Sequence, residues 1–482
     1  MTQILRDLDP QDWSEFRRLA HSSLDMMIDD IATLRERPLW VQTPTQPRQG
    51  LPLDGRGLAA TLVEFDAKIR PYVTGNRHPS FMGWAHGAGT PVGMVAEMLA
   101  AGLNANCGGR DHVGIEVEKQ IAGWMAEAFG FPATASGLFV TGASQANFMG
   151  VLIARRAALG AEVRKEGVDG RPQLCAYASQ EAHGCLAQAM DMAGLGSSFL
   201  RRIACDGEGR MSLLALAEQV AVDRAAGLQP FLLVGSAGTV NFGAVDALAE
   251  LAAFAKAENL WLHVDGAFGA LAIFSEKLRL GIAGIEQADS IAFDFHKWAH
   301  VPYDAGFILV REQSRQTDAF ASPQAYLSRA ASGLAAGDVW PCDLGPDLSR
   351  SFRALKVWFT LQSFGTKALG EAMERNCEVA RHLANLIQNS DDFRLAAPMP
   401  LNIVCFSLKG ENADAANRRL VEALHVEGVA APSITLIGGQ ATIRCAIFNH
   451  RTSLGDMTLF FAEATALARA MNSEPPTPRL TL

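Results

Sequence analysis

From about residue 75 to residue 310, short apolar runs alternate with stretches of helical periodicity. This alternation restricts the fold more than any other feature of the sequence. Helical stretches such as 213–225 and 247–257 separate most of the runs. Strand–helix alternation of this kind predicts an α/β layer with a mostly parallel central sheet. The predicted strands are 138–141, 174–178, 231–235, 260–264, 290–293 and 306–310.

The two ends of the chain follow different patterns. Residues 11–37 have the periodicity of an amphipathic helix, and a connection rich in proline and glycine follows it. The apolar face of this helix must be buried against a partner subunit or against its own chain. After residue 349 we expect helices at 352–364, 368–388, 413–426 and 454–470, and strands at 403–408 and 441–447. The predicted parts are an N-terminal helical segment (1–75), a large domain (76–363) and a small C-terminal α+β domain (364–482).

Composition excludes several classes of protein. The 482 residues carry a net charge of −9, which disfavours nucleic acid and anionic membranes as partners. There is no apolar run of 18 residues and no basic, apolar leader at the start, so we expect a cytoplasmic protein. The eight cysteines form no C-x-x-C pair, and we expect no metal site.

An acid and a lysine follow two of the predicted strands. Asp265 ends the run 260–264, and His296 and Lys297 come just after the run 290–293. Ligands of open α/β sheets bind at the carboxyl ends of strands, so these groups are expected in one crevice. Either residue alone is more often a turn or surface residue. Together they match the needs of pyridoxal 5'-phosphate (PLP), a lysine amine for the cofactor aldehyde and a carboxylate for the protonated ring nitrogen.

Several motifs resemble those of the group II PLP-dependent decarboxylases, which act on aromatic amino acids, histidine, tyrosine or glutamate. The resemblance covers nearly the whole chain. It implies the type I, aspartate aminotransferase-like fold and a homodimer. The motifs are Glu15-Phe-Arg-Arg18, Arg77-His-Pro-Ser-Phe-Met-Gly-Trp84, His296-Lys-Trp298, Ser351-Phe-Arg-Ala-Leu-Lys-Val-Trp-Phe359 and Ile443-Arg-Cys-Ala-Ile-Phe-Asn449.

The resemblance also implies roles for single residues. It makes Lys297 the residue that forms the Schiff base, places Asp265 at the pyridine nitrogen and stacks His183 on the cofactor ring. Ala143 and Ser144 match the phosphate-binding turn, where backbone N–H groups at the start of a helix face an anion. The remaining residues expected at the cofactor are Thr239, Ala267, Asp294 and His296.

A tyrosine bears on the type of reaction. The segment Phe320-Ala-Ser-Pro-Gln-Ala-Tyr326-Leu resembles the mobile loop of the aromatic-amino-acid enzymes, whose tyrosine is the proposed proton donor to the substrate carbanion. Relatives with phenylalanine there tend to make aldehydes. Tyr326 therefore favours simple decarboxylation, although a packing role stays open. The stretch 330–337, rich in small residues, suits a flexible lid.

Two departures from the family pattern are informative. The aromatic-amino-acid enzymes have asparagine where this chain has Asp294. A carboxylate about 4 Å from one phosphate charge costs about 4 kcal/mol at an effective dielectric constant of about 20. We therefore expect Asp294 to be turned away, paired with a base or protonated. The segment 86–90 also differs, so the family does not reveal the substrate side chain. Trp84 and His86 are candidates to face the substrate, with a place in the core as the alternative.

The predicted function is PLP-dependent decarboxylation of an L-amino acid to its amine and CO2. The alternatives are an aldehyde synthase, another PLP lyase or an aminotransferase, and an inactive scaffold relative. Arg350 and Arg353 could meet an acidic substrate group, and structural salt bridges are an equal alternative.

Overall fold

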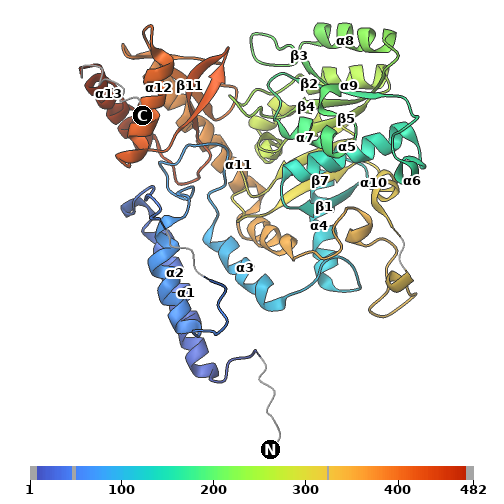
Figure 1. The fold of residues 1–482 in the computed structure, drawn as a ribbon, viewed down its shortest axis with the longest axis horizontal. Coiled ribbons are helices and arrows are strands. Elements are labelled where there is room, and N and C mark those ends of the chain that lie inside the picture. The colour runs from blue at the N-terminus through green and yellow to red at the C-terminus, as the bar shows by residue number, and fades with distance from the viewer. Residues whose placement is uncertain (1–7, 46–49, 323–324, 474–482) are drawn as a thin grey trace, which may run out of the picture.

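A seven-stranded sheet with helices around it is formed by strands between residues 136 and 310 (Figure 1). A computed structural model describes residues 8–45, 50–322 and 325–473. The strand order is β1-β7-β6-β5-β4-β2-β3. Every neighbouring pair is parallel except the two that involve β7. The strands are β1 (Ser136–Val140), β2 (Leu174–Ser179), β3 (Leu200–Ile203), β4 (Gln229–Ser236), β5 (Trp261–Asp265), β6 (Ser290–Asp294) and β7 (Gly306–Val310).

The helices around this sheet come mainly from the segments between its strands. The unit β4–α9–β5 is a parallel crossover, as its spacing in the sequence predicts. The strand residues are almost all buried, because helices exclude water from a parallel sheet. The helices are α3 (Pro91–Leu103), α4 (Val113–Ala128), α5 (Ala143–Leu159), α6 (Val163–Glu166), α7 (Cys185–Met192), α8 (Leu213–Ala225), α9 (Leu248–Ala257) and α10 (Gln313–Phe320).

The direction of β7 determines which strands end at the same edge of the sheet. β7 runs antiparallel to both β1 and β6, so β1 points the same way as β6 and the other parallel strands. The carboxyl ends of six strands therefore lie along one edge. The short connection 295–305 cannot hold a crossover helix, which explains why β7 returns antiparallel to β6.

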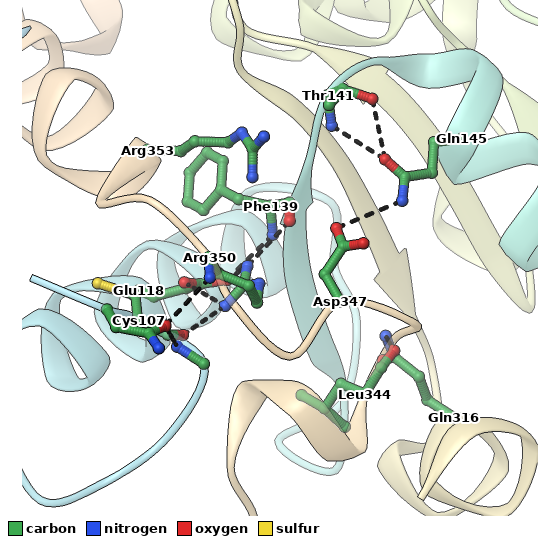
Figure 2. Close-up of polar contacts among 12 residues, drawn as sticks. Cys107, Glu118, Phe139, Thr141, Gln145, Gln316, Leu344, Asp347, Arg350 and Arg353 are labelled. Atoms are coloured by element: carbon green, nitrogen blue, oxygen red, sulfur yellow. Dashed lines mark hydrogen bonds and ion pairs between the residues drawn. The ribbon is translucent and has the colours of Figure 1, made fainter.

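A buried ion pair closes the free side of the edge strand β1 (Figure 2). Arg350 lies with its guanidinium 2.5 Å from Glu118 of α4, and both side chains are almost fully buried. Phe139 in β1 donates its backbone N–H to Glu118 and accepts a bond from Arg350 at its carbonyl. The side chains of Glu118 and Arg350 thus bond the Phe139 N–H and C=O groups that face no neighbouring strand, and these bonds hold β1 in position.

The C-terminal part forms a second, antiparallel sheet of order β10-β11-β9-β8. The long helix α11 links the two sheets and is kinked at Gly365, whose φ of 71° interrupts the helix near the break that the sequence predicts. The elements are α11 (Arg353–Gln388), β8 (Phe393–Leu395), β9 (Ile403–Leu408), α12 (Ala413–Val426), β10 (Ser433–Ile437), β11 (Gln440–Ala446) and α13 (Leu454–Ser473).

The N-terminal segment contains two helices, α1 (Trp13–Ala32) and α2 (Leu58–Lys68), that lie side by side away from the central sheet (Figure 1). α1 is shorter than the predicted 11–37, because a separate 3-10 turn follows Thr33. Asp30 of α1 is buried and pairs with Arg37, Arg70 and Arg77. Burial opposes its charge, but these arginines hold the pKa of Asp30 below its usual range.

Among the described residues, no helix is both long enough and apolar enough to cross a membrane. The same residues contain no group of three or more His, Cys, Asp or Glu side chains arranged to hold a metal ion.

Candidate active site

A cavity of about 520 Å³ lies at the carboxyl ends of β1, β2, β4, β5 and β6, the position expected for the ligand of an open α/β sheet. Residues of the C-terminal part, including Asn402 and Arg444, complete its wall. Tyr326 is the one predicted site residue that does not line it. The predicted residues that do are Trp84, His86, Ala143, Ser144, His183, Thr239, Asp265, Ala267, Asp294, His296 and Lys297.

Asp265 is the last residue of β5 and lies in the wall of the cavity. It is only 7 % exposed, and its Oδ1 accepts a hydrogen bond from the backbone N–H of Ala267 at 3.1 Å. Burial raises the pKa of Asp265, while that bond and the charge of Lys297 oppose the rise. A buried carboxylate of this kind is stabilised when a cation binds in front of it.

Lys297 comes three residues after the end of β6 and extends toward Asp294, the last residue of that strand. The Lys297 Nζ lies 3.1 Å from Asp294 Oδ2. Burial works against the charge of the ammonium group, but the adjacent carboxylate raises the pKa of Lys297 above its ordinary value. Asp294 is thus paired with a base, which is one of the three states expected from the sequence.

The turn Thr141–Ala143 joins β1 to the first residue of α5. Gln145 braces this turn, because its Oε1 accepts hydrogen bonds from the backbone N–H and the hydroxyl of Thr141 (Figure 2). Gly142, the N-cap residue, has no side chain to cap the helix. Asp294 Oδ1 accepts the backbone N–H of Ala143 at 2.7 Å instead. The N-terminus of α5 therefore faces the cavity with a carboxylate already bound to it.

Close backbone packing positions the loop that carries His296 and Lys297. A Cβ atom on Gly87 would lie 1.6 Å from the carbonyl oxygen of His296, so a residue with a side chain does not fit there. His296 Nδ1 accepts the backbone N–H of Ala305 at 3.0 Å, which leaves the proton of the neutral ring on Nε2. Burial lowers the pKa of His296 and favours this neutral form.

His183 and Thr239 enter the cavity from the loops after β2 and β4. His183 Nδ1 accepts the backbone N–H of Cys185 at 3.1 Å, and Thr239 Oγ1 accepts the N–H of Ala244 at 2.9 Å. Both side chains are therefore fixed by backbone donors. Cys185 also lines the cavity, and burial raises the pKa of its thiol to about 11, so it stays protonated at neutral pH.

An aromatic cluster lines the part of the cavity that contains Trp84 and His86, the two predicted substrate residues. The rings of Trp84 and His86 lie 5.8 Å apart, and Tyr303 extends the cluster with its ring 6.3 Å from His86 and 4.4 Å from His296. Trp84 has a positive φ of 53° and is 57 % exposed, a strained conformation that surrounding contacts must hold in place. The hydroxyl of Tyr303 accepts the N–H of Gly87.

Tyr303 and Arg444 also line the cavity, and neither was predicted from the sequence. Arg444 of β11 donates to the backbone carbonyls of Trp84, Val240 and Asn241, and it is 4 % exposed. Its Nη2 is buried and has no hydrogen-bond partner among the described residues. An arginine within the predicted strand 441–447 was the available signal, because a buried guanidinium needs partners.

Tyr326, Arg350 and Arg353 lie outside this cavity. Tyr326 is 69 % exposed and lines a separate cavity beside α10. Arg350 pairs with Glu118, and Arg353 pairs with Asp304 at 2.7 Å (Figure 2 draws both arginines). Of the two alternatives for these arginines, the contacts favour structural salt bridges.

Comparison with known proteins gives the family. Residues 48–409 match the model of the pyridoxal-dependent decarboxylase conserved domain. The chain belongs to the pyridoxal-dependent decarboxylase family. As a member of this family it is a PLP-dependent amino-acid decarboxylase, a carboxy-lyase, and its cofactor is PLP. The cavity fits that cofactor, since it presents a partly buried lysine, a helix N-terminus and the buried carboxylate of Asp265, which forms no ion pair with any described residue.

Relatives across the pyridoxal-dependent decarboxylase family match nearly the whole chain. An aromatic-L-amino-acid decarboxylase of Bacillus atrophaeus is 30 % identical, with 96 % of this chain and 97 % of the relative covered. A phenylacetaldehyde synthase of Arabidopsis thaliana is 28 % identical, with 91 % and 93 % covered. A crystal structure of Oryza sativa TDC with PLP and tryptamine has a TM-score of 0.88 at 24 % identity and covers 96 % of this chain and 100 % of that one. This likeness confirms the predicted type I fold.

Proposed function

We propose that the chain decarboxylates an L-amino acid to the amine and CO2, with PLP carried on Lys297. The observation that carries the proposal is that Lys297 and Asp265, from the ends of adjacent parallel strands, line one cavity with the N-terminus of α5. The cavity thus offers an amine, an anion for the ring nitrogen and donors for the phosphate. Bound PLP supplies an electron sink for the bond that breaks at the substrate Cα.

The side chains around the cavity have separate tasks in this proposal. Asp265 keeps the ring nitrogen charged, because its buried carboxylate favours a cation beside it. His183, held by the N–H of Cys185, provides a fixed ring surface against which the cofactor packs. Thr239 and Ala267 border the same space and limit the positions open to the ring.

We infer an aromatic or large apolar side chain for the substrate. Trp84, His86 and Tyr303 form the cluster at the substrate end, and Ile434 and Leu401 add apolar surface. Aromatic rings pack well against one another in such a wall. Several relatives carry names that refer to aromatic amino acids, including tryptophan and tyrosine decarboxylases of rice.

A homodimer completes the proposal. Apolar side chains stay exposed on the N-terminal helices and on α3, and exposed apolar surface is typical of protein interfaces. In a dimer, Tyr326 would reach the cavity of the partner, since it lies outside the cavity of its own chain. The exposed residues are Trp13, Phe16, Ile28, Leu58, Val63, Ile69, Val95, Met98, Leu99 and Leu103.

Aldehyde synthesis is the second candidate function. It is favoured by the relatives named phenylacetaldehyde synthase and 4-hydroxyphenylacetaldehyde synthase. Tyr326, where aldehyde-forming relatives tend to have phenylalanine, favours the amine instead.

The test is mass spectrometry of the products after the PLP-loaded protein is incubated with a pool of the common amino acids. One amine that appears while its parent amino acid disappears supports decarboxylation and identifies the substrate. An aldehyde as the main product moves the assignment to the second candidate, and a keto acid points to transamination. Consumption of an acidic amino acid alone would contradict the inferred aromatic or apolar side chain.

A further inference from the structure

Asp294 occupies the place where the cofactor phosphate is expected to bind. Its Oδ1 accepts the N–H of Ala143, the first residue of α5, and its Oδ2 lies 3.1 Å from Lys297 Nζ. The side chain is 3 % exposed, so little water screens its charge. One carboxylate therefore uses both a backbone donor of the phosphate turn and the amine that is to carry the cofactor.

A second anion at this turn is unfavourable while Asp294 stays charged. An anion that binds the N-terminus of α5 must come close to Asp294, because Asp294 is already bonded to the Ala143 N–H, one of the amides at that end of the helix. Two like charges in a buried site repel strongly, since the surroundings screen them less than water does. Lys297 supplies one positive charge, which balances only one of the two anions.

His296, next to Asp294, cannot take up the proton that would offset the second negative charge without losing a hydrogen bond. Ala305 donates its N–H to His296 Nδ1, so that nitrogen must keep its lone pair, and Nε2 already carries the ring proton. His296 Nε2 lies 3.7 Å from Asp294 Oδ2. A further proton on the ring would break the bond from Ala305, which leaves the carboxylate as the acceptor of a proton.

We propose that Asp294 takes up one proton when an anion binds at the N-terminus of α5, and that the resulting carboxylic acid donates a hydrogen bond to that anion. The proton comes from solvent: an O–H bond forms on the carboxylate while the bond to that proton breaks in hydronium or the buffer acid, and no other covalent bond changes. The phosphate site of this chain thus binds its anion and a proton together. An asparagine at the same position would donate a similar bond without any proton uptake.

The groups that face Asp294 allow this assignment. The pKa of Lys297 is raised, so its ammonium is charged before and after the anion binds. Burial raises the pKa of Tyr303, which therefore stays neutral, and Asp265 is bonded to Ala267 at another part of the cavity. The titratable groups that act on Asp294 from β5 and from the loop after β6 are Asp265, His296, Lys297 and Tyr303.

The test uses the full chain freed of cofactor and sulfate as the anion. Sulfate stays fully ionised near neutral pH, so any proton taken up on binding must be on the protein. Calorimetric titrations in buffers of different ionisation enthalpy count these protons. We expect more protons taken up per sulfate by the wild-type chain than by Asp294→Asn, and a wild-type affinity that falls more steeply with rising pH than that of the variant. Asp294→Asn should bind sulfate more tightly at pH 9.

Two further measurements make the result decisive. Asp265→Asn, which removes another acid from the same cavity, should keep the wild-type proton count. Infrared difference spectra of the wild-type chain should show the C=O band of a protonated carboxylic acid when sulfate or PLP binds, and this test does not depend on any variant folding. Equal proton counts in wild type and Asp294→Asn, or no acid band in the wild-type spectra, would overturn the proposal.

Discussion

Lys297 is the residue on which the proposed chemistry depends most directly. Lys297→Ala should lower the turnover by about 10³-fold or more, because the amine that carries the cofactor is lost. The variant should still bind PLP non-covalently through the phosphate turn. Borohydride treatment followed by denaturation should leave cofactor attached to the wild-type chain and to Lys277→Ala, an exposed control, but not to Lys297→Ala. Attachment in Lys297→Ala would place the cofactor on another lysine.

Tyr326 decides between amine and aldehyde in our proposal. Tyr326→Phe should slow the release of amine and raise the ratio of aldehyde to amine, because the hydroxyl that protonates the carbanion is gone. Tyr303→Phe is the matched control, since Tyr303 lines the cavity and loses only its bond to Gly87. Both products can be quantified by mass spectrometry. An unchanged ratio in Tyr326→Phe, or an equal rise in both variants, would show that the loop tyrosine is not the proton donor.

Most of the predicted site residues line one cavity, but the sequence did not reveal every residue of that cavity. Asp265 and Lys297 could be placed because each follows a strand, and the ends of parallel strands meet. Tyr303 and Arg444 were not placed, because several of the contacts that bring them to the cavity are with segments far away in the sequence. Arg444, for example, bonds the carbonyl of Trp84, which lies 360 residues earlier.

At the scale of elements, the segment that contains Gly87 positions the loop after β6. Gly87→Ala should weaken cofactor binding, because its Cβ would overlap the carbonyl of His296 and displace Lys297. Overpacking typically costs about 1–3 kcal/mol, which corresponds to about 5- to 150-fold in affinity. Absorbance titration with PLP measures the effect. Gly123→Ala in α4, where a Cβ has open space, should bind as the wild type does. Normal affinity in Gly87→Ala would show that this contact is not needed to hold the loop.

Strong apolar periodicity predicted elements well, and its absence explains those that were missed. β7, β9, α8 and α12 have the predicted bounds. β3 was not predicted, because it is a four-residue edge strand that reads Leu-Arg-Arg-Ile, and Arg201 within it pairs with Asp223 of α8. Its hydrogen bonds to β2 stabilise the strand, although its own sequence has little strand propensity.

For the whole molecule, the mostly parallel sheet was predictable, but the arrangement of the N-terminal helices was not. The order of strands and helices restricts the sheet to few topologies. The sequence of residues 11–37 predicts an apolar helix face but not which part of the protein covers it. α2 has no buried residue, and its Val63 is 70 % exposed, so the described part of the chain leaves apolar side chains of this segment uncovered.

The proposed dimer leads to the last prediction. Val63→Glu should shift the protein from dimer to monomer, because an unpaired charge in a buried interface costs about 3–5 kcal/mol, which weakens association by more than about 100-fold. Leu214→Glu is the control, since Leu214 is 72 % exposed on α8, far from the N-terminal helices (Figure 1). Sedimentation velocity over a range of concentrations measures the shift.

Activity should follow association in the same variant. If Tyr326 acts in the cavity of the partner, diluted Val63→Glu should lose amine formation while it still binds PLP, because the cofactor contacts come from one chain. Raising the protein concentration should restore activity by mass action. A fully active Val63→Glu monomer would contradict both the dimer and the role of Tyr326 across it. An active Val63→Glu dimer would show instead that α2 lies outside the interface.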